Sequence, residues 1–267
     1  MQKILWPRVE DLTPEVNEDY VDVHGLMKPL LALTDPKNSN GRPSNLLVSG
    51  PHGTGKTLLA ANMATEIAKK SGSTVPLITF DCSEDTFELM LTGSSRVVAG
   101  GETPFIPGPF PTAIHMANQT GCCVLCVEEI SALTPGAQKE FNRMTDWRRS
   151  LYIPDAGLNL KLNPGCHVII IATMNPSGYG GVYTMNEDLR SRFDEIYVPY
   201  PTMDQEKKIL RAVCPYASTS DIERSIQLAE TSRTEKLDYT LSTRDLYKFL
   251  SNYHRLSDHP DGAEFAL

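Results

Sequence analysis

A phosphate-binding loop pattern lies early in the chain. The pattern GxxxxGK[ST] is met at every required position by Gly50-Pro51-His52-Gly53-Thr54-Gly55-Lys56-Thr57. In such a loop the glycines let backbone N–H groups turn toward phosphates, the lysine reaches the β- and γ-phosphates, and the threonine hydroxyl binds Mg²⁺. The residues therefore predict a nucleoside triphosphate site running from Gly50 to Leu58, with Thr57 as a Mg²⁺ ligand.

The segments on either side of this loop argue against a chance match to the pattern. A short apolar strand is predicted over 45–49, and Leu59, Met63 and Ile67 follow at the four-residue spacing of a helix face over 58–70. A loop between a strand and a helix directs the positive end of the helix dipole toward the phosphates.

Two acids follow a second apolar run, Val124-Leu125-Cys126-Val127-Glu128-Glu129. Hydrolysis of a triphosphate needs a Mg²⁺ partner and a base that polarises water. We assign the first role to Glu128 and the second to Glu129. Taken alone, paired acids could also be a solvated strand terminus, but the phosphate loop favours the catalytic interpretation.

Further candidate residues come at the ends of later segments. Asn175 follows an apolar strand, where its amide could orient the attacking water. Arg190 and Arg192 stand just before the next strand, and an arginine delivered to a neighbour's γ-phosphate stabilises transition-state charge. One of this close pair is expected to be an ordinary surface arginine.

Length, charge and cysteines limit the class of protein. The chain has 267 residues and a formal net charge of −8, which argues against a strongly basic nucleic-acid footprint without excluding a local one. No apolar run is long enough for a membrane span and no secretory signal is seen, so a cytoplasmic location is expected. The six cysteines show one CxxC spacing without a second, which favours buried apolar cysteines over a metal site.

The order of the apolar segments predicts an α/β fold. Five strand candidates, with helical or irregular segments between them, indicate a parallel sheet covered on both faces: 45–49, 75–81, 122–127, 167–173 and 195–200. From Thr202, which forms a capping-box pattern with Gln205, only helical patterns follow. We therefore expect an α/β domain over 1–201, a small helical domain over 202–256 and a tail over 257–267.

Two insertions interrupt this plan. Residues 91–111 are rich in glycine and proline and predict a long excursion before the next helix. Residues 150–163 alternate about Asp155-Ala156-Gly157, as a β-hairpin does. Both could be functional elements or ordinary surface loops.

Together these motifs resemble the AAA+ ATPases over about residues 18–250. Within that superfamily the MoxR group is the nearest resemblance, and its CbbQ/NorQ branch the nearest within the group. The segments that carry this resemblance are Gly108-Pro109-Phe110, Glu128-Glu129-Ile130, Asp146-Trp147-Arg148-Arg149, Ala172-Thr173-Met174-Asn175-Pro176, Cys82-Ser83-Glu84-Asp85-Thr86 and Ser242-Thr243-Arg244.

The resemblance implies roles residue by residue. Glu128 and Glu129 match the Walker B acids, although the family usually has Asp where Glu128 stands, and Asn175 matches the sensor 1 position. Arg192 best matches the arginine finger, with Arg190 second, and Arg244 matches the sensor 2 arginine that reaches the γ-phosphate from the lid. Val23 and His24 resemble the segment that lines the adenine pocket. The family also implies ATP with Mg²⁺, a sheet order of 5-1-4-3-2 and a ring, usually hexameric.

Three interpretations of the motor's purpose remain open. Relatives in the MoxR group remodel or activate a partner protein, often one with a von Willebrand factor A domain, and we favour this interpretation. A motor acting on nucleic acid would need a basic inner surface, for which only Lys161, Arg148, Arg149 and Arg96 are candidates near the insertions. A nucleotide-dependent scaffold would follow if Glu128 weakened the metal site. The preference for ATP over GTP rests on the resemblance alone.

Overall fold

The chain forms two compact units. This computed structural model describes residues 3–15, 20–38, 42–146, 148–175, 183–235, 237 and 239–256, so the predicted tail lies outside it. The first unit comprises Met1–Val16, Met27–Ser49 and Thr57–Tyr197, and the second comprises Asn17–Leu26, Gly50–Lys56 and Val198–Leu267.

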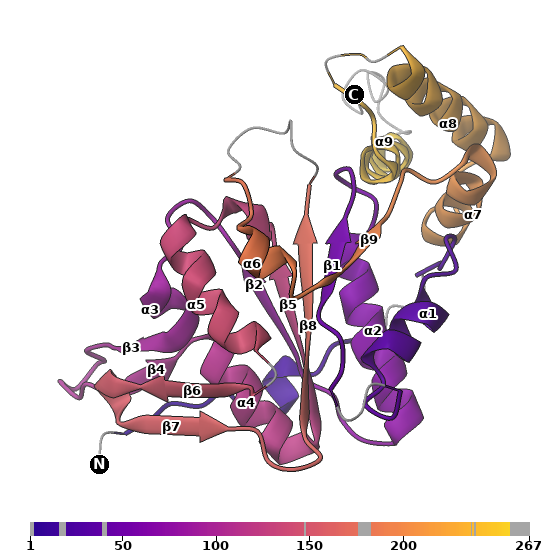
Figure 1. Cartoon of the computed structure of the whole chain (residues 1–267). Coiled ribbons are helices and arrows are strands. Elements are labelled where there is room, and N and C mark those ends of the chain that lie inside the picture. The colour runs from indigo at the N-terminus through magenta and orange to yellow at the C-terminus, as the bar shows by residue number, and fades with distance from the viewer. Residues whose placement is uncertain are drawn as a thin grey trace. The chain divides into compact units, whose positions relative to one another are not determined.

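The first unit is built on a five-stranded parallel sheet (Figure 1). Its strands, in the spatial order β2-β5-β8-β1-β9, are β2 (Leu77–Asp81), β5 (Cys122–Glu128), β8 (His167–Met174), β1 (Leu46–Ser49) and β9 (Asp194–Tyr197). Counted along the chain as the first to fifth strands of this sheet, they run 2-3-4-1-5. This is the expected order 5-1-4-3-2 read from the other edge, so the predicted topology is confirmed.

Apolar side chains cover both faces of this sheet. Successive residues of a strand point to opposite faces, yet Leu46, Leu47 and Val48 are all fully buried. The unit's main helices are α1 (Met27–Thr34), α2 (Lys56–Ser71), α4 (Pro109–Thr120) and α5 (Pro135–Thr145). Figure 1 shows α4 and α5 on one side of the sheet and α1 and α2 on the other. The continuous apolar runs of the strands thus follow from burial on both faces.

The two insertions are both β-hairpins. Gly93–Ser95 (β3) pairs antiparallel with Phe105–Pro107 (β4), after a short helix α3 (Glu88–Thr92). The expected excursion over 91–111 is therefore too long, because its first residues belong to α3 and its last to α4. The second hairpin was predicted correctly: β6 (Ser150–Ile153) pairs with β7 (Leu158–Lys161), and a turn η3 (Pro154–Ala156) with Gly157 connects them.

The N-terminal segment packs on the first hairpin. Ile4 pairs with Phe105 of β4, and the Trp6 ring stacks on the His115 ring of α4 with their centroids 4.0 Å apart. A single turn, η1 (Glu10–Leu12), follows. The base of the β3–β4 hairpin is therefore fixed to the body of the first unit.

The second unit has a core of three helices. These are α7 (Met203–Val213), α8 (Thr219–Thr234) and α9 (Thr243–Leu256), so the helical region expected after Thr202 is present. The predicted capping box is formed: Thr202 accepts from the Gln205 amide, and the Gln205 side chain accepts from the Thr202 amide. A buried ion pair of Arg233 and Glu206, at 2.9 Å, ties α8 to α7, and the Thr243 hydroxyl donates to the same carboxylate.

Among the described residues, no helix is both long and apolar enough to cross a membrane. All six cysteines are free, and Cys123 and Cys126 are buried in β5, as the sequence predicts for apolar cysteines. Burial, with Asp81 and Glu129 nearby, raises the pKa of the Cys82 thiol to about 12, so this thiol is not a reactive group at neutral pH.

Candidate nucleotide site

The phosphate loop joins β1 to α2, as its sequence predicts. Gly53 has a φ of +70°, and a Cβ at this position would lie 2.3 Å from the Ser242 hydroxyl oxygen, so only glycine fits. Lys56 Nζ donates to the carbonyls of Gly50 and Pro51 at 2.8 and 2.7 Å, and the Thr54 hydroxyl donates to the Pro51 carbonyl at 3.0 Å. These bonds hold the loop in a curved form with the ammonium group against its backbone. This cradle and the helix that begins at Lys56 fit a chain of phosphates.

The metal-ligating candidates lie together in the first unit. The Thr57 hydroxyl, on the first turn of α2, donates to Glu128 Oε2 at the end of β5 across 2.5 Å, a short charge-assisted hydrogen bond. Hard oxygen ligands of this kind suit Mg²⁺, which binds one or two protein groups together with phosphates and water. The glutamate at position 128, where the family usually has aspartate, thus contacts the threonine directly. The residues present fit the predicted ion.

Glu129 follows Glu128 in an uncommon backbone conformation. Its φ of 53° and ψ of 44° are left-handed, which is rare for a residue other than glycine, and its amide donates to the Thr173 hydroxyl of β8 at 3.3 Å. Left-handed residues of this kind occur preferentially at functional sites, where the surrounding fold holds them. A 3₁₀ turn, η2 (Ile130–Ala132), begins directly after it.

Asn175 lies at the same edge of the sheet as Glu129. It comes directly after β8, and β8 is the neighbour of β5 with Val127 level with Ala172. Because β5 and β8 are parallel neighbours, the predicted water-orienting residue and the predicted base both follow the carboxyl ends of adjacent strands.

The two candidate finger arginines precede β9 (Asp194–Tyr197) and so lie at the amino ends of the parallel strands, opposite to Glu129 and Asn175. Arg190 closes the short helix α6 (Glu187–Arg190), and its guanidinium contacts Glu195 at 2.5 Å. Arg192 contacts Asp188 at 3.5 Å and Asp146 at 3.9 Å, and its side chain is 30% exposed. Arg192 is thus held by two carboxylates while its side chain still reaches solvent.

The strand register shows where Arg192 lies relative to the two candidate acids, Glu128 and Glu129. Asp194 is level with Leu46, Leu46 with Ile171, and Ile171 with Cys126. Glu129 lies three residues beyond this level and Arg192 two residues before it. The two residues therefore lie past opposite ends of their strands, and these strands are three strand spacings, or about 14 Å, apart. Arg192 therefore lies apart from Glu128 and Glu129 within the chain.

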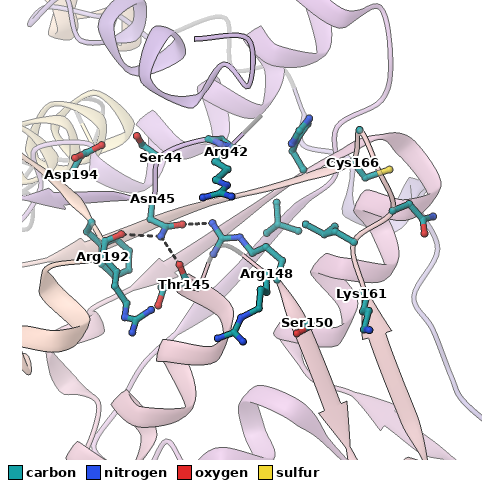
Figure 2. A pocket seen from close by; sticks show the side chains of 18 of the residues that line it. Arg42, Ser44, Asn45, Thr145, Arg148, Ser150, Lys161, Cys166, Arg192 and Asp194 are labelled. Atoms are coloured by element: carbon teal, nitrogen blue, oxygen red, sulfur yellow. Dashed lines mark hydrogen bonds between the residues drawn. The ribbon is translucent and has the colours of Figure 1, made fainter. Parts of the chain in front are cut away.

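A basic pocket surrounds Arg192 at this amino edge (Figure 2). It has a volume of about 610 Å³, and Arg42, Arg148, Arg149, Lys161 and Arg192 contribute positive charge to its lining. The Asp146 carboxylate accepts hydrogen bonds from the Arg148 amide at 2.9 Å and Nε at 3.0 Å. These bonds lower the pKa of Asp146, which stays ionised beside the arginines. The pocket favours an anionic group.

Arg149 lines this pocket and also has a structural role that its position in the sequence does not reveal. Its guanidinium is buried and donates to the Met144 carbonyl and to Asn45 Oδ1, while Asn45 Nδ2 donates to the Arg192 carbonyl at 2.9 Å. Burial lowers its pKa to about 10, so it remains charged at neutral pH. The adjacent arginines before β6 were visible in the sequence, but only the fold shows that the first is exposed and the second buried.

Arg149 should matter for stability far more than Arg148 does. In Arg149→Ala, the Met144 carbonyl and the Asn45 side chain lose a buried donor, so we expect the free energy of unfolding to fall by about 2–4 kcal/mol. Arg148→Ala, at an exposed neighbouring position, should change it very little. Urea unfolding of both variants checks this, and equal losses in the two would contradict it.

The remaining candidates lie in the second unit. Arg244 is the second residue of α9, and a Cβ added at Gly53 would lie 3.3 Å from the Arg244 Cβ, so the first turn of this helix adjoins the phosphate loop. The carbonyl of Val23 accepts from Gln205 Nε2 at 2.6 Å, which places the predicted adenine segment with His24 at the start of α7. The loop, Arg244 and the Val23 segment are thus all parts of one unit.

A five-stranded parallel sheet with a phosphate loop after its first strand, acids after its third, and a helical C-terminal region defines a P-loop nucleotide-binding protein of the AAA class. The comparison with known families agrees. The profile of the family described as AAA domain (dynein-related subfamily) matches residues 45–193, and the chain belongs to this family. The chain is thus a nucleotide-binding protein of the AAA+ ATPase class.

Relatives of similar length exist in staphylococci. The chain is 31% identical over 194 residues to an uncharacterised protein of Staphylococcus haemolyticus, covering 71% of this chain and 68% of the relative. An uncharacterised protein of Staphylococcus aureus strain USA300 is 30% identical over the same shares of the two chains.

Proposed function

We propose that this chain is a Mg²⁺-dependent ATPase that works as a ring and remodels or activates a partner protein, in the manner of the MoxR group. The observation that carries the ring is the position of Arg192, at the opposite edge of the sheet from Glu129 and Thr57. An arginine so placed contributes to hydrolysis only in a neighbouring subunit. The basic pocket around Arg192 supports the same conclusion, since it suits the negative charge of a neighbour's phosphates.

Each residue then has a defined task. Lys56 and the amides of the phosphate loop bind the phosphates, and Thr57 with Glu128 holds Mg²⁺, which neutralises charge on the phosphate oxygens. Glu129 takes a proton from the attacking water, which Asn175 orients. Arg192 of the next subunit stabilises the charge that develops on the transferred phosphoryl group, and Arg244 senses the γ-phosphate from the lid.

The exposed insertions support a protein partner. Near the first hairpin, the side chains of Phe87 and Val97 are 52% and 76% exposed, and on the second hairpin that of Tyr152 is 62% exposed. Apolar groups exposed on such projections suit contact with a protein better than with a phosphate backbone. A ring that acts on nucleic acid is the alternative. A rise in ATPase rate with added DNA that falls with salt would favour it.

Assembly dependence tests the proposed function. The ATPase rate per subunit is measured against protein concentration, with the particle mass determined in parallel. We expect the rate to rise with the fraction of assembled protein, because Arg192 completes a neighbour's site. A rate per subunit that is high and constant in the monomer would contradict the ring, and tight ATP binding with no hydrolysis in the assembled protein would favour a scaffold.

Glu128 offers a separate test of the metal site. In Glu128→Gln the carboxylate that accepts from Thr57 is lost, so we expect the Mg²⁺ concentration for half-maximal hydrolysis to rise about 10- to 100-fold. Glu66→Gln, which alters an exposed glutamate on α2 paired with Lys69, is the matched control and should leave it unchanged. An unaltered Mg²⁺ requirement in Glu128→Gln would remove Glu128 from the metal site.

A further inference from the structure

The phosphate loop and the first turn of α9 pack directly against each other within the second unit. Ser242, just before α9, is fully buried, and its hydroxyl occupies the space beside Gly53 that a side chain there would need. Gly53 therefore has no room for a side chain. The contact therefore joins the loop that binds phosphates to the helix that carries Arg244.

His52 adds a side-chain contact to this junction. Its Nε2 lies 4.0 Å from Asp245 Oδ2, and the two side chains are 31% and 21% exposed. The ring lies edge-on to Tyr200, with centroids 6.4 Å apart, and 5.9 Å from the ring of Tyr239. The imidazole is thus positioned by two aromatic rings with one nitrogen toward the carboxylate.

Asp245 in turn fixes the start of α9. Its Oδ2 accepts from the Ser242 amide at 2.9 Å and from the Ser242 hydroxyl at 2.6 Å. Burial alone would raise the pKa of Asp245, but the hydrogen bonds from Ser242 and Tyr239 and the nearby His52 lower it instead, so the group is a carboxylate at neutral pH. Arg244 lies between these two residues in the chain, and its backbone is therefore held by the same contacts.

We propose that His52 is a positioning residue that couples the phosphate loop to α9, and so sets the position of Arg244 relative to the bound nucleotide. The phosphate-loop pattern requires no particular residue at position 52, and binding of phosphates by the loop backbone does not use its side chain. The imidazole can therefore serve the contact with Asp245. The role assigned to Arg244 rests on the proposed function.

Hydrogen exchange of the nucleotide-free protein tests the coupling itself. In His52→Ala, we expect the amides of the first turn of α9 to exchange about tenfold faster, since their support from the loop is lost. His52→Gln keeps a polar side chain of similar length beside Asp245 and should restore most of the protection. His254→Ala, near the far end of the same helix where His254 stacks on Tyr216, is the matched control and should leave this turn unchanged. Unchanged exchange in His52→Ala would overturn the proposal.

A double-mutant cycle tests the consequence for Arg244. Dissociation constants for ATP and ADP are measured for the wild type, His52→Ala, Arg244→Ala and the double variant. We expect His52→Ala to weaken ATP binding about tenfold and ADP binding less than about twofold. The double variant should bind ATP as Arg244→Ala does, because both changes remove the same interaction, that of Arg244 with the γ-phosphate. Equal losses for ATP and ADP, or effects that multiply, would refute the coupling.

These results separate the inference from the function on which it rests. Normal ATP binding by the wild type with no effect of His52→Ala would refute the coupling and leave the ATPase intact. A wild type that binds neither nucleotide would refute both the proposed function and the role of Arg244.

Discussion

Replacing Glu129 with glutamine is expected to lower kcat for ATP hydrolysis by a factor of about 100 to 10,000. Glutamine has the same size and keeps the bond from the backbone amide to Thr173, but its amide does not accept the proton of the attacking water. The dissociation constant for ATP should stay within about twofold, because the phosphate loop and the Thr57–Glu128 pair are unaltered. Single-turnover hydrolysis and equilibrium binding measure the two quantities separately.

Asp81→Asn is the matched control for this prediction. Asp81 ends β2 and is level with Glu128 across the sheet, so the change removes a carboxylate from the same edge without altering the proposed base. It should keep most of the wild-type rate. Equal losses in the two variants would show that the negative charge of this edge matters more than the base, and a Glu129→Gln variant with near-normal kcat would exclude Glu129 from catalysis.

Replacing Arg192 with alanine is expected to reduce kcat by a factor of about 10³ to 10⁵, the range that an arginine finger contributes. Each subunit's own nucleotide affinity should change little, since Arg192 lies at the opposite end of the parallel strands from Glu128 and Glu129. Arg192→Lys should restore little of the rate, because a point charge does not reproduce the fork of a guanidinium. Steady-state kinetics, with particle mass measured in parallel, check both variants.

Two other arginines make this prediction specific. Arg143→Ala removes an exposed arginine of α5 that pairs with Glu140, and it should leave hydrolysis unchanged. Arg190→Ala distinguishes the second finger candidate: its guanidinium is engaged by Glu195, so we expect a much smaller loss than in Arg192→Ala. A larger loss in Arg190→Ala would transfer the finger role to Arg190.

The central residues of the candidate site could be predicted because each of them comes directly after an apolar strand in the sequence. The phosphate loop, the acids after β5 and Asn175 after β8 each terminate an apolar run, and parallel strands bring their carboxyl ends to one edge. The sheet order came from the family resemblance, because spacing along the chain does not say which strands are neighbours.

The features that could not be predicted from the sequence depend mostly on contacts between segments that are far apart in the chain. Arg148 and Arg149 are adjacent and chemically identical, yet one is exposed and bonded to Asp146 while the other is buried against Asn45, 104 positions earlier in the chain. The basic pocket is likewise built from separate stretches of chain. The glycine- and proline-rich insertion looked irregular, because β3 and β4 are too short to show an alternating pattern.

Mixing two inactive variants tests the central claim, catalysis across subunits, most directly. Glu129→Gln keeps an intact Arg192, and Arg192→Ala keeps an intact Glu129. If they assemble at random in equal amounts, about a quarter of the interfaces join an intact base to an intact finger. We therefore predict that the mixture regains up to about a quarter of the wild-type rate, although each variant alone keeps at most about a hundredth of it. A mixture that assembles fully and stays inactive would contradict the account.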